Sequence, residues 1–180
     1  MTNKFINMKD SIFSKKRILL LGSGELGKEL VIESKRLGLE VIAIDRYEKA
    51  PAMQVADYSR VIDMGDKNIL KNVIKEFKPD YVVPEIEALS IEALKELEDE
   101  GFNIIPNART VEITMNRDKI RHLASRDLKI KTAKFNYIFE FDDLEKKADE
   151  IGFPLLLKPL MSSSGTVSYT HLTLPTIITV

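Results

Sequence analysis

The stretch that decides the fold is Arg-Ile-Leu-Leu-Leu-Gly-Ser-Gly-Glu-Leu-Gly, residues 17–27. The short, largely apolar run Arg17–Leu21 predicts a strand and leads directly into a turn with glycine at positions 22, 24 and 27. A buried strand that ends in such a turn and opens a helix is the context of the dinucleotide-binding fingerprint. Leu26, Leu30 and Leu37 continue at near-helical spacing, and Gly38 ends the helix. A second apolar run, Glu40–Ile44, predicts the next strand.

The same alternation continues along the chain. Strands are expected at Arg60–Asp63, Tyr81–Val83 and Asn103–Ile105, and helices at Lys67–Phe77 and Leu89–Glu100. Strands that alternate with helices form a parallel sheet covered on both faces, so the fold class is α/β, a doubly wound Rossmann-like domain. Ligands of such domains bind at the carboxyl ends of the strands. We expect the glycine turn, Asp45 and Pro84–Glu87 to meet at that edge.

A second α/β unit begins after Pro106. The pattern predicts a helix over Thr110–Asp127, a strand over Lys134–Phe139, a helix over Asp142–Ile151 and a strand over Pro154–Lys158. We therefore divide the chain into an N-terminal extension at 1–14, a Rossmann-like domain at 15–110, the incomplete start of a second domain at 111–165 and a tail at 166–180.

Composition restricts the possible functions. The 27 basic and 28 acidic residues give a net charge of −1, so no charge field recruits nucleic acid or anionic lipid. The chain has no cysteine, which excludes disulfides, thiolate zinc sites and thiol nucleophiles. No apolar run has the length of a signal sequence or a membrane span. We expect a cytoplasmic protein without nucleic-acid or membrane partners.

The tail differs in composition from the rest of the chain. Residues 166–180 carry no Lys, Arg, Asp or Glu and are rich in threonine. A buried β-hairpin would account for this composition. We instead interpret the segment as a non-native tail, because Val167–Ile177 resembles a translated adapter sequence.

The glycine turn has both a ligand-binding and a structural interpretation. Asp45 follows the turn at the distance of a ribose-binding acid, which favours a nicotinamide dinucleotide. Glu25, in the first turn of the helix, argues against one because a carboxylate there repels a pyrophosphate. Tight packing of the strand on the helix would also explain the glycines.

Two further groups of polar residues are candidates for binding. Glu85 and Glu87 follow a strand end, where a carboxylate suits a substrate amine or hydroxyl, although both could be solvated loop acids. Lys158 ends a strand and Met161–Gly165 forms a Ser/Gly loop, which suits a phosphate. Arg117 could belong to this site or to a solvent-facing helix. The two histidines, His122 and His171, have no partner at metal-ligand spacing, and no role is assigned to them.

Several motifs together resemble one family. The chain from about Lys16 to Gly165 is similar to the formate-dependent glycinamide ribonucleotide transformylases, which belong to the ATP-grasp superfamily. The matching motifs are Leu20–Leu30, Asp45–Tyr47, Ala50–Met53, Val83–Ala88, Thr114–Arg117, and Lys158–Pro159 with Met161–Gly165. The family's loop continues after Gly165 with a lysine and a glycine, whereas Thr166 stands here.

The resemblance implies an activity and a set of contacts. A parent enzyme would phosphorylate formate with ATP, and the amine of glycinamide ribonucleotide would attack the resulting formyl phosphate in purine biosynthesis. The implied substrate contacts are Glu25, Leu26 and Glu85, and the implied ATP contacts are Arg117, Lys158, Ser163, Ser164 and Gly165. Magnesium would be bound by acids outside this chain, Asp45 would be structural, and no catalytic residue or metal ligand is assigned within it.

Alternatives to this activity remain. The nearest is the ATP-grasp carboxylation of aminoimidazole ribonucleotide, and another is a non-catalytic NAD-binding module. We expect the chain to be a truncated N-terminal fragment that is inactive by itself, from a parent that forms a homodimer.

Overall fold

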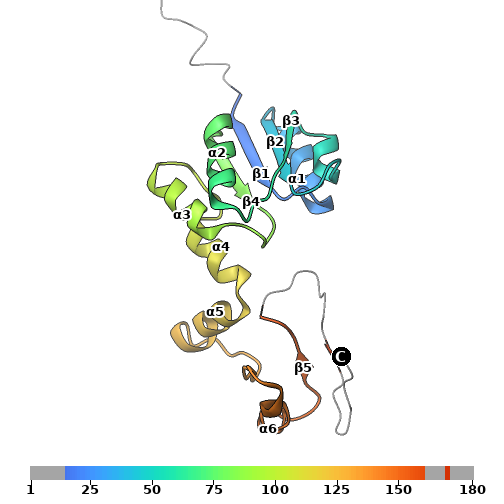
Figure 1. Cartoon of the computed structure of the whole chain (residues 1–180), viewed down its shortest axis with the longest axis vertical. Coiled ribbons are helices and arrows are strands. Elements are labelled where there is room, and N and C mark those ends of the chain that lie inside the picture. Colours follow the sequence, from blue (N-terminus) through green and yellow to red (C-terminus); the bar gives the residue numbers. More distant parts are fainter. Residues whose placement is uncertain (1–14, 161–168, 171–180) are drawn as a thin grey trace, which may run out of the picture. The chain divides into compact units, whose positions relative to one another are not determined.

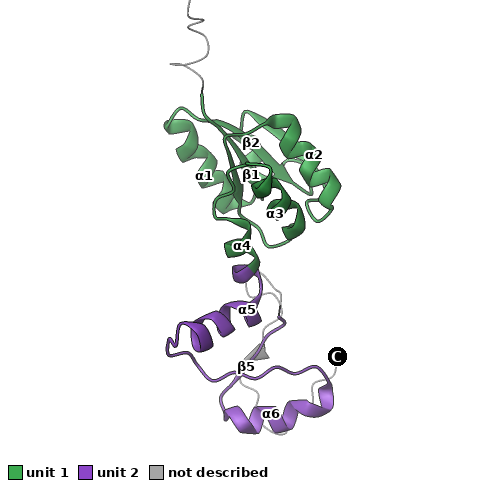
Figure 2. Ribbon diagram, turned by 90° about the vertical axis from the view of Figure 1, so that its left-hand side faces the viewer, with its two compact units in different colours: residues 1–112 green, residues 113–180 purple. Residues whose placement is uncertain are grey.

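The computed structural model describes residues 15–160 and 169–170. The N-terminal extension at 1–14, most of the tail, and Ser163, Ser164 and Gly165 lie outside these residues. The chain forms two compact units, Met1–Glu112 and Ile113–Val180 (Figure 2), and each is described by itself.

Unit 1 contains a parallel four-stranded sheet (Figure 1). Its strands are β1 (Arg17–Leu21), β2 (Glu40–Asp45), β3 (Tyr58–Val61) and β4 (Tyr81–Pro84), in the order β3-β2-β1-β4. The prediction for β1 is confirmed residue for residue. The strand predicted over Arg60–Asp63 is present but shifted, because β3 begins and ends two residues earlier.

Helices cover both faces of this sheet. Unit 1 contains α1 (Glu25–Arg36), the 3-10 turn η1 (Pro51–Gln54), α2 (Lys67–Phe77) and α3 (Ile91–Asp99). Figure 2 shows α1 on one face of the sheet and α2 on the other, which confirms the doubly wound α/β fold. Leu19, Leu20 and Leu21 of β1 have no exposed surface, and they form the centre of the core.

The face of α1 that packs on the sheet is not the leucine face of the sequence pattern. The buried residues of α1 are Gly27, Val31 and Ser34. Leu26 and Leu37 are each 72% exposed. The helix is therefore predicted correctly, but its small residues face the sheet because the glycine turn brings the helix close to β1.

The expected fifth strand at Asn103–Ile105 is reduced to one bridge. Ile104 pairs in parallel with Val82, through hydrogen bonds from Val82 N to Asn103 O and from Ile105 N to Val82 O. Pro106 follows at once and has no N–H to donate, so the ladder ends there.

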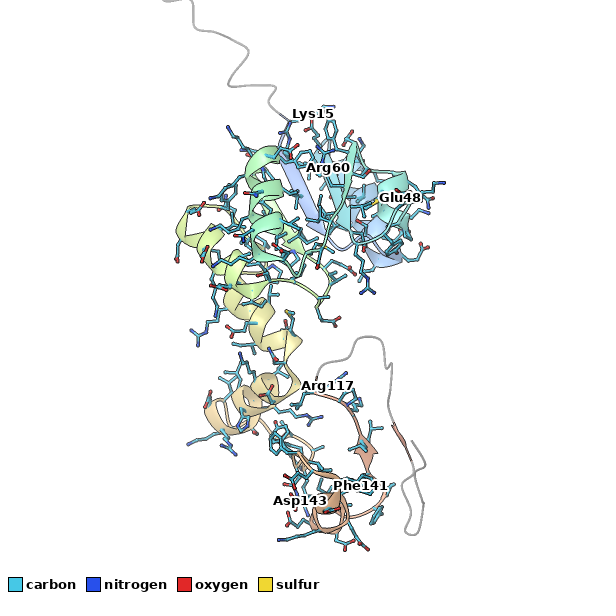
Figure 3. The ribbon with its side chains drawn as sticks, viewed as in Figure 1. Lys15, Glu48, Arg60, Arg117, Phe141 and Asp143 are labelled. Atoms are coloured by element: carbon cyan, nitrogen blue, oxygen red, sulfur yellow. The ribbon has the colours of Figure 1, made fainter. Side chains whose placement is uncertain are left out.

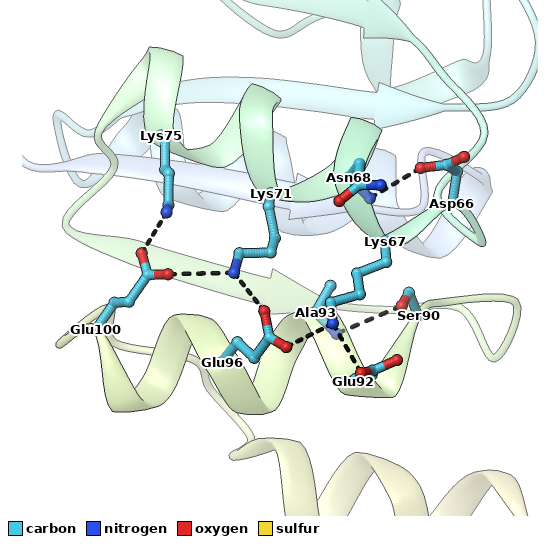
Figure 4. Close-up of polar contacts among 10 residues, drawn as sticks. All are labelled: Asp66, Lys67, Asn68, Lys71, Lys75, Ser90, Glu92, Ala93, Glu96 and Glu100. Atoms are coloured by element: carbon cyan, nitrogen blue, oxygen red, sulfur yellow. Dashed lines mark hydrogen bonds and ion pairs between the residues drawn. The ribbon is translucent and has the colours of Figure 1, made fainter.

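A ladder of ion pairs joins α2 to α3 (Figure 4). Lys67 Nζ lies 2.7 Å from a carboxylate oxygen of Glu92 and 2.5 Å from one of Glu96. Both helices place charges at a four-residue spacing, so each set faces the other. The ladder consists of Lys67, Lys71 and Lys75 of α2 with Glu92 and Glu96 of α3 and Glu100 at its C-cap.

The ladder predicts an acid-sensitive contribution to stability. Hydrogen bonds from Lys67 and Lys71 lower the pKa of Glu96 from 4.5 to about 2. A carboxyl whose pKa is lowered by folding stabilises the fold above its unfolded pKa, and this contribution is lost as pH falls toward the folded value. We expect Glu96→Gln to lower the melting temperature at pH 7, with a deficit that shrinks between about pH 4.5 and pH 2.

A matched variant is Glu33→Gln on α1, whose exposed carboxylate contacts the exposed Arg36 side chain of the same helix at 3.4 Å. It should change the melting temperature little at either pH. If the deficit in melting temperature of Glu96→Gln stays constant across this pH range, the ladder does not make the acid-sensitive contribution to stability.

Unit 2 is more irregular than expected. The helix predicted over Thr110–Asp127 is wrong as one element, because Asn116 has an extended backbone between α4 and α5. Lys134–Phe139 is irregular, and the last predicted strand is shortened to Leu156–Leu157. The observed elements are α4 (Ala108–Met115), which begins in unit 1, α5 (Arg117–His122), the π-helical turn η2 (Leu123–Asp127), η3 (Phe141–Asp143), α6 (Leu144–Ile151), β5 (Leu156–Leu157) and β6 (Tyr169–Thr170).

The strands β5 and β6 pair antiparallel. No helix in the described part of the chain is long and apolar enough to cross a membrane.

Candidate functional site

The turn between β1 and α1 fits closely against the segment that follows β4. Gly22 has a φ of +112°. A Cβ atom at this position would lie 2.5 Å from Ile86 Cγ2 and 2.6 Å from Glu85 Oε2. Glu85 N donates to Leu21 O at 2.8 Å, which holds the segment beside the end of β1. Glycine is therefore required at position 22 by both the backbone angle and the space.

Asp45 holds the turn from the end of β2. The residue is buried, with 5% of its surface exposed. Oδ2 accepts a hydrogen bond from Ser23 N at 2.7 Å, and Oδ1 accepts one from Arg46 N at 2.7 Å. Ser23 Oγ donates to Ile44 O at 3.0 Å, so the turn is fixed twice to this strand. These contacts agree with the structural role expected for Asp45 and leave its carboxylate engaged with backbone rather than turned to a ribose.

Glu85 is a half-buried acid at the same edge. Burial, the charge of Asp45 and the charge of Glu87 raise its pKa, in that order of size. Its carboxylate accepts no hydrogen bond from the residues that the structure describes. Glu87 is exposed. A carboxylate placed beside a like charge without a donor is suited to a ligand that brings a positive charge or an N–H or O–H group.

The outer side of the turn is open. A Cβ atom at Gly24 would have no neighbour within 4 Å. Glu25 and Leu26 start α1 immediately after it, and both are exposed. The structure thus brings Asp45 and Glu85 to the turn at the carboxyl edge of the sheet, as the sequence predicts, and Glu25 and Leu26 follow the turn with their side chains accessible to a ligand.

Unit 2 contains a separate pocket of about 670 Å³. Four cations line it, and no Asp or Glu does so among the described residues. Aromatic rings also contribute to its wall. The cations are Arg117, Arg121, Lys134 and Lys158, and the rings are Phe135, Tyr137, Phe139 and Phe153. The pocket therefore suits an anionic ligand that carries a planar group.

Arg117 and Lys158, which lie far apart in the sequence, meet in this pocket. Arg117 begins α5 (Figure 3), and its Nη1 donates to Pro159 O at 2.6 Å. Its backbone N also lies 3.4 Å from Leu160 O. Because Pro159 follows Lys158 directly, these contacts hold the end of β5 against α5.

Sequence reasoning gave no firm role to several lining residues. Arg121 lies four residues after Arg117, and this spacing in the sequence indicates that both residues share one face of a helix. Phe135 and Tyr137 were expected in a strand. Burial raises the pKa of Tyr137, and its buried hydroxyl has no hydrogen-bond partner within the described residues.

A metal site is not evident in the described part of the chain. There, no three His, Cys, Asp or Glu side chains are grouped so that they could hold a metal ion. The acids at the edge of the sheet in unit 1 are Asp45 and Glu85, with Glu87 exposed.

The fold and the edge of the sheet define the class of protein. A doubly wound parallel sheet with a glycine turn at its carboxyl edge is a Rossmann-like α/β domain. The chain belongs to the family of the ribonucleotide synthetase preATP-grasp domain, whose model matches residues 15–115. Residues after 115 lie outside this match, and the start of an ATP-grasp domain there stays a prediction.

Individual relatives agree with this family. The chain is 96% identical over 158 residues to the formate-dependent phosphoribosylglycinamide formyltransferase of Prochlorococcus marinus strain AS9601, covering 88% of this chain and 40% of that protein. The chain thus spans about 40% of the length of this curated relative.

Solved structures show the same fold. Glycinamide-RNase-transformylase T from Mycobacterium tuberculosis is 41% identical with a TM-score of 0.66, covering 68% of this chain and 38% of that one. N5-carboxyaminoimidazole ribonucleotide synthetase from Thermotoga maritima is 27% identical with a TM-score of 0.72. The match covers 86% of this chain and 40% of that one.

Proposed function

We propose that this chain is the N-terminal part of an enzyme that formylates glycinamide ribonucleotide with formate and ATP. The observation that carries the proposal is the 96% identity to a relative named for this reaction. The chain spans 40% of that relative, so the proposed activity is that of the longer protein. Within it, unit 1 would bind the ribonucleotide and unit 2 would supply part of the ATP site.

The substrate contacts would come from the turn and from β4. Glu25 and Leu26 are exposed beside the open side of the turn. Glu85 lacks a donor within the described residues, and its pKa is raised. An amine or hydroxyl of glycinamide ribonucleotide would supply that donor, so we assign Glu85 to the ribonucleotide.

The ATP contacts would come from the cationic pocket. Arg117 and Lys158 both line this pocket, and no described Asp or Glu does so. Their positive charge would offset the negative charge of the phosphates. Ser163, Ser164 and Gly165, outside the described residues, would complete the loop that follows Lys158. Magnesium would be held by acids from the rest of the parent. We further propose a cytoplasmic homodimer.

The reaction is acyl transfer through an anhydride. An oxygen of formate attacks the γ-phosphorus of ATP, the bond to the bridging oxygen breaks, and ADP leaves with the electron pair. The amine nitrogen of the ribonucleotide then attacks the carbonyl carbon of formyl phosphate. Inorganic phosphate leaves, and the nitrogen gives up a proton. Neither step needs a covalent enzyme intermediate, so the protein acts by positioning and charge stabilisation.

The ATP site can be tested in the full-length Prochlorococcus marinus relative. We expect Lys158→Ala to raise the apparent KM for ATP on the order of tenfold to hundredfold, since a charged hydrogen bond contributes about 1.5–3 kcal/mol. The KM for the ribonucleotide should change less than about twofold. The measurement is steady-state formylation with each substrate varied in turn.

The same assay separates the proposal from its nearest alternative. The Thermotoga relative is named as a carboxyaminoimidazole ribonucleotide synthetase, so bicarbonate with aminoimidazole ribonucleotide is the competing substrate pair. Turnover of that pair, with none of formate and glycinamide ribonucleotide, would reject the proposed function.

A further inference from the structure

We propose that Arg121 is a further phosphate-binding residue of the nucleotide pocket, held in place by the ring of Phe135. This inference rests on the proposed function, because it concerns the same ATP site. Arg121 lines the pocket together with Arg117 and Lys158.

Aromatic packing fixes the position of Arg121. Its Cζ lies 5.4 Å from the centroid of the Phe135 ring, within cation–π range. Phe135 in turn meets Tyr137 edge to face, with centroids 5.6 Å apart. His122 stacks on Tyr137 at 5.9 Å and an interplanar angle of 16°. Residues of α5 and of the segment after η2 therefore form one cluster that orders the guanidinium beside the pocket.

The charge of Arg121 is left available for a ligand. No carboxylate of the described residues lies within ion-pair distance of its guanidinium, whereas Lys67 and Lys71 in unit 1 each contact two glutamates. A guanidinium over a ring keeps its N–H groups at the edge, where they can donate in pairs to phosphate oxygens. Because no described acid lines the pocket, nothing there competes with a phosphate for these donors.

Helix geometry places Arg121 and Arg117 on the same side of α5. Residues four apart lie one turn apart on one face of a helix. Arg117 already donates to Pro159 O, so part of its hydrogen-bonding capacity holds the end of β5. The side chain of Arg121 makes no hydrogen bond to the described residues, since only its backbone O accepts one from Ser125 Oγ, and its donors remain for the ligand. A second guanidinium thus extends the cationic wall along the helix.

The test uses the full-length Prochlorococcus marinus relative with ATP as the probe. We expect Arg121→Gln to raise the apparent KM for ATP on the order of tenfold, with kcat changed less than about threefold. Arg121→Lys keeps the charge and should recover part of the loss. Phe135→Leu should give an intermediate increase, because it removes the ring that orients the guanidinium.

The matched control is Arg126→Gln, which removes the same charge from an exposed residue of η2 that does not line the pocket. Its KM for ATP should stay within about twofold of the parent's. Arg117→Gln and Lys158→Gln serve as positive controls, and calorimetric titration with ADP reports binding for any variant too slow to assay.

The outcomes separate this inference from the proposed function. If Arg121→Gln binds ATP like the parent while Lys158→Gln does not, Arg121 has no ligand role and the proposed function stands. If none of the three pocket variants weakens ATP binding, both fail. An equal loss in Arg121→Gln and Arg126→Gln would assign the effect to net charge and overturn the inference.

Discussion

Replacement of Gly22 by alanine is expected to destabilise unit 1 by on the order of 3–5 kcal/mol. A φ of +112° is a region that side chains rarely adopt, and such a conformation costs about 1–3 kcal/mol. The added methyl group would also lie 2.5 Å from Ile86 Cγ2 and 3.1 Å from Ile86 N. Because the second neighbour is backbone, the segment after β4 would have to move. Urea denaturation of the chain measures the loss.

The matched control for this substitution is Gly24→Ala in the same turn. Gly24 has a φ of −69°, and an added Cβ would meet nothing within 4 Å. The loss of stability should remain below about 1 kcal/mol, the difference expected between glycine and alanine at the N-cap of a helix. Equal losses for the two variants would show that neither the backbone angle nor the contact with Ile86 governs the turn.

Much of unit 1 could be predicted because its signals are local. β1 and α2 match their predicted bounds. Asp66 explains the start of α2, since its side chain accepts hydrogen bonds from Asn68 N and Ile69 N at 2.8 and 2.9 Å. β3 was displaced because all its residues are exposed at the edge of the sheet, and a strand without a buried face carries no hydrophobic register.

Unit 2 was less predictable because its elements depend on partners distant in the sequence. The segment at 134–139 alternates like a strand, but its rings pack on His122 and Arg121 instead of pairing in a sheet. Propensity alone does not reveal such tertiary packing.

Part of the candidate site could be predicted from the sequence, and part could not. The carboxyl edge of the sheet follows from strand order, so the meeting of the turn, Asp45 and Glu85 could be predicted. The pocket in unit 2 required the fold, because contact between Arg117 and Pro159 joins residues 42 positions apart. The roles of Glu25, Leu26, Glu85, Arg117 and Lys158 stay predictions until the variants are measured.

Glu85→Gln in the full-length relative is expected to raise the KM for glycinamide ribonucleotide on the order of tenfold to hundredfold. Glutamine keeps the shape of the side chain but removes the charge that we assign to the ribonucleotide. The KM for ATP should change little, because ATP is assigned to unit 2. Steady-state kinetics with each substrate varied separately gives both values. The matched control is Glu87→Gln, an exposed acid two residues further on, for which we expect a change below about twofold.

The same substitution should make the fold more stable at neutral pH. Burial and the charges of Asp45 and Glu87 raise the pKa of Glu85 above 4.5, so the folded state disfavours the ionised form. A carboxyl of this kind destabilises the fold as pH rises through 4.5 toward the raised value, and glutamine removes that cost. Glu85→Gln should therefore melt above the parent at pH 7, and the difference should disappear below about pH 4.5.

Opposite changes in stability and substrate affinity would identify Glu85 as a binding residue rather than a structural one. A structural acid loses stability and activity together when it is replaced, whereas an acid kept for a ligand is destabilising until the ligand binds. If Glu85→Gln lowers the melting temperature at pH 7, the carboxylate has a stabilising partner and the assignment fails. If the melting temperature rises while the KM for the ribonucleotide is unchanged, the charge of Glu85 destabilises the edge of the sheet but the substrate binds elsewhere.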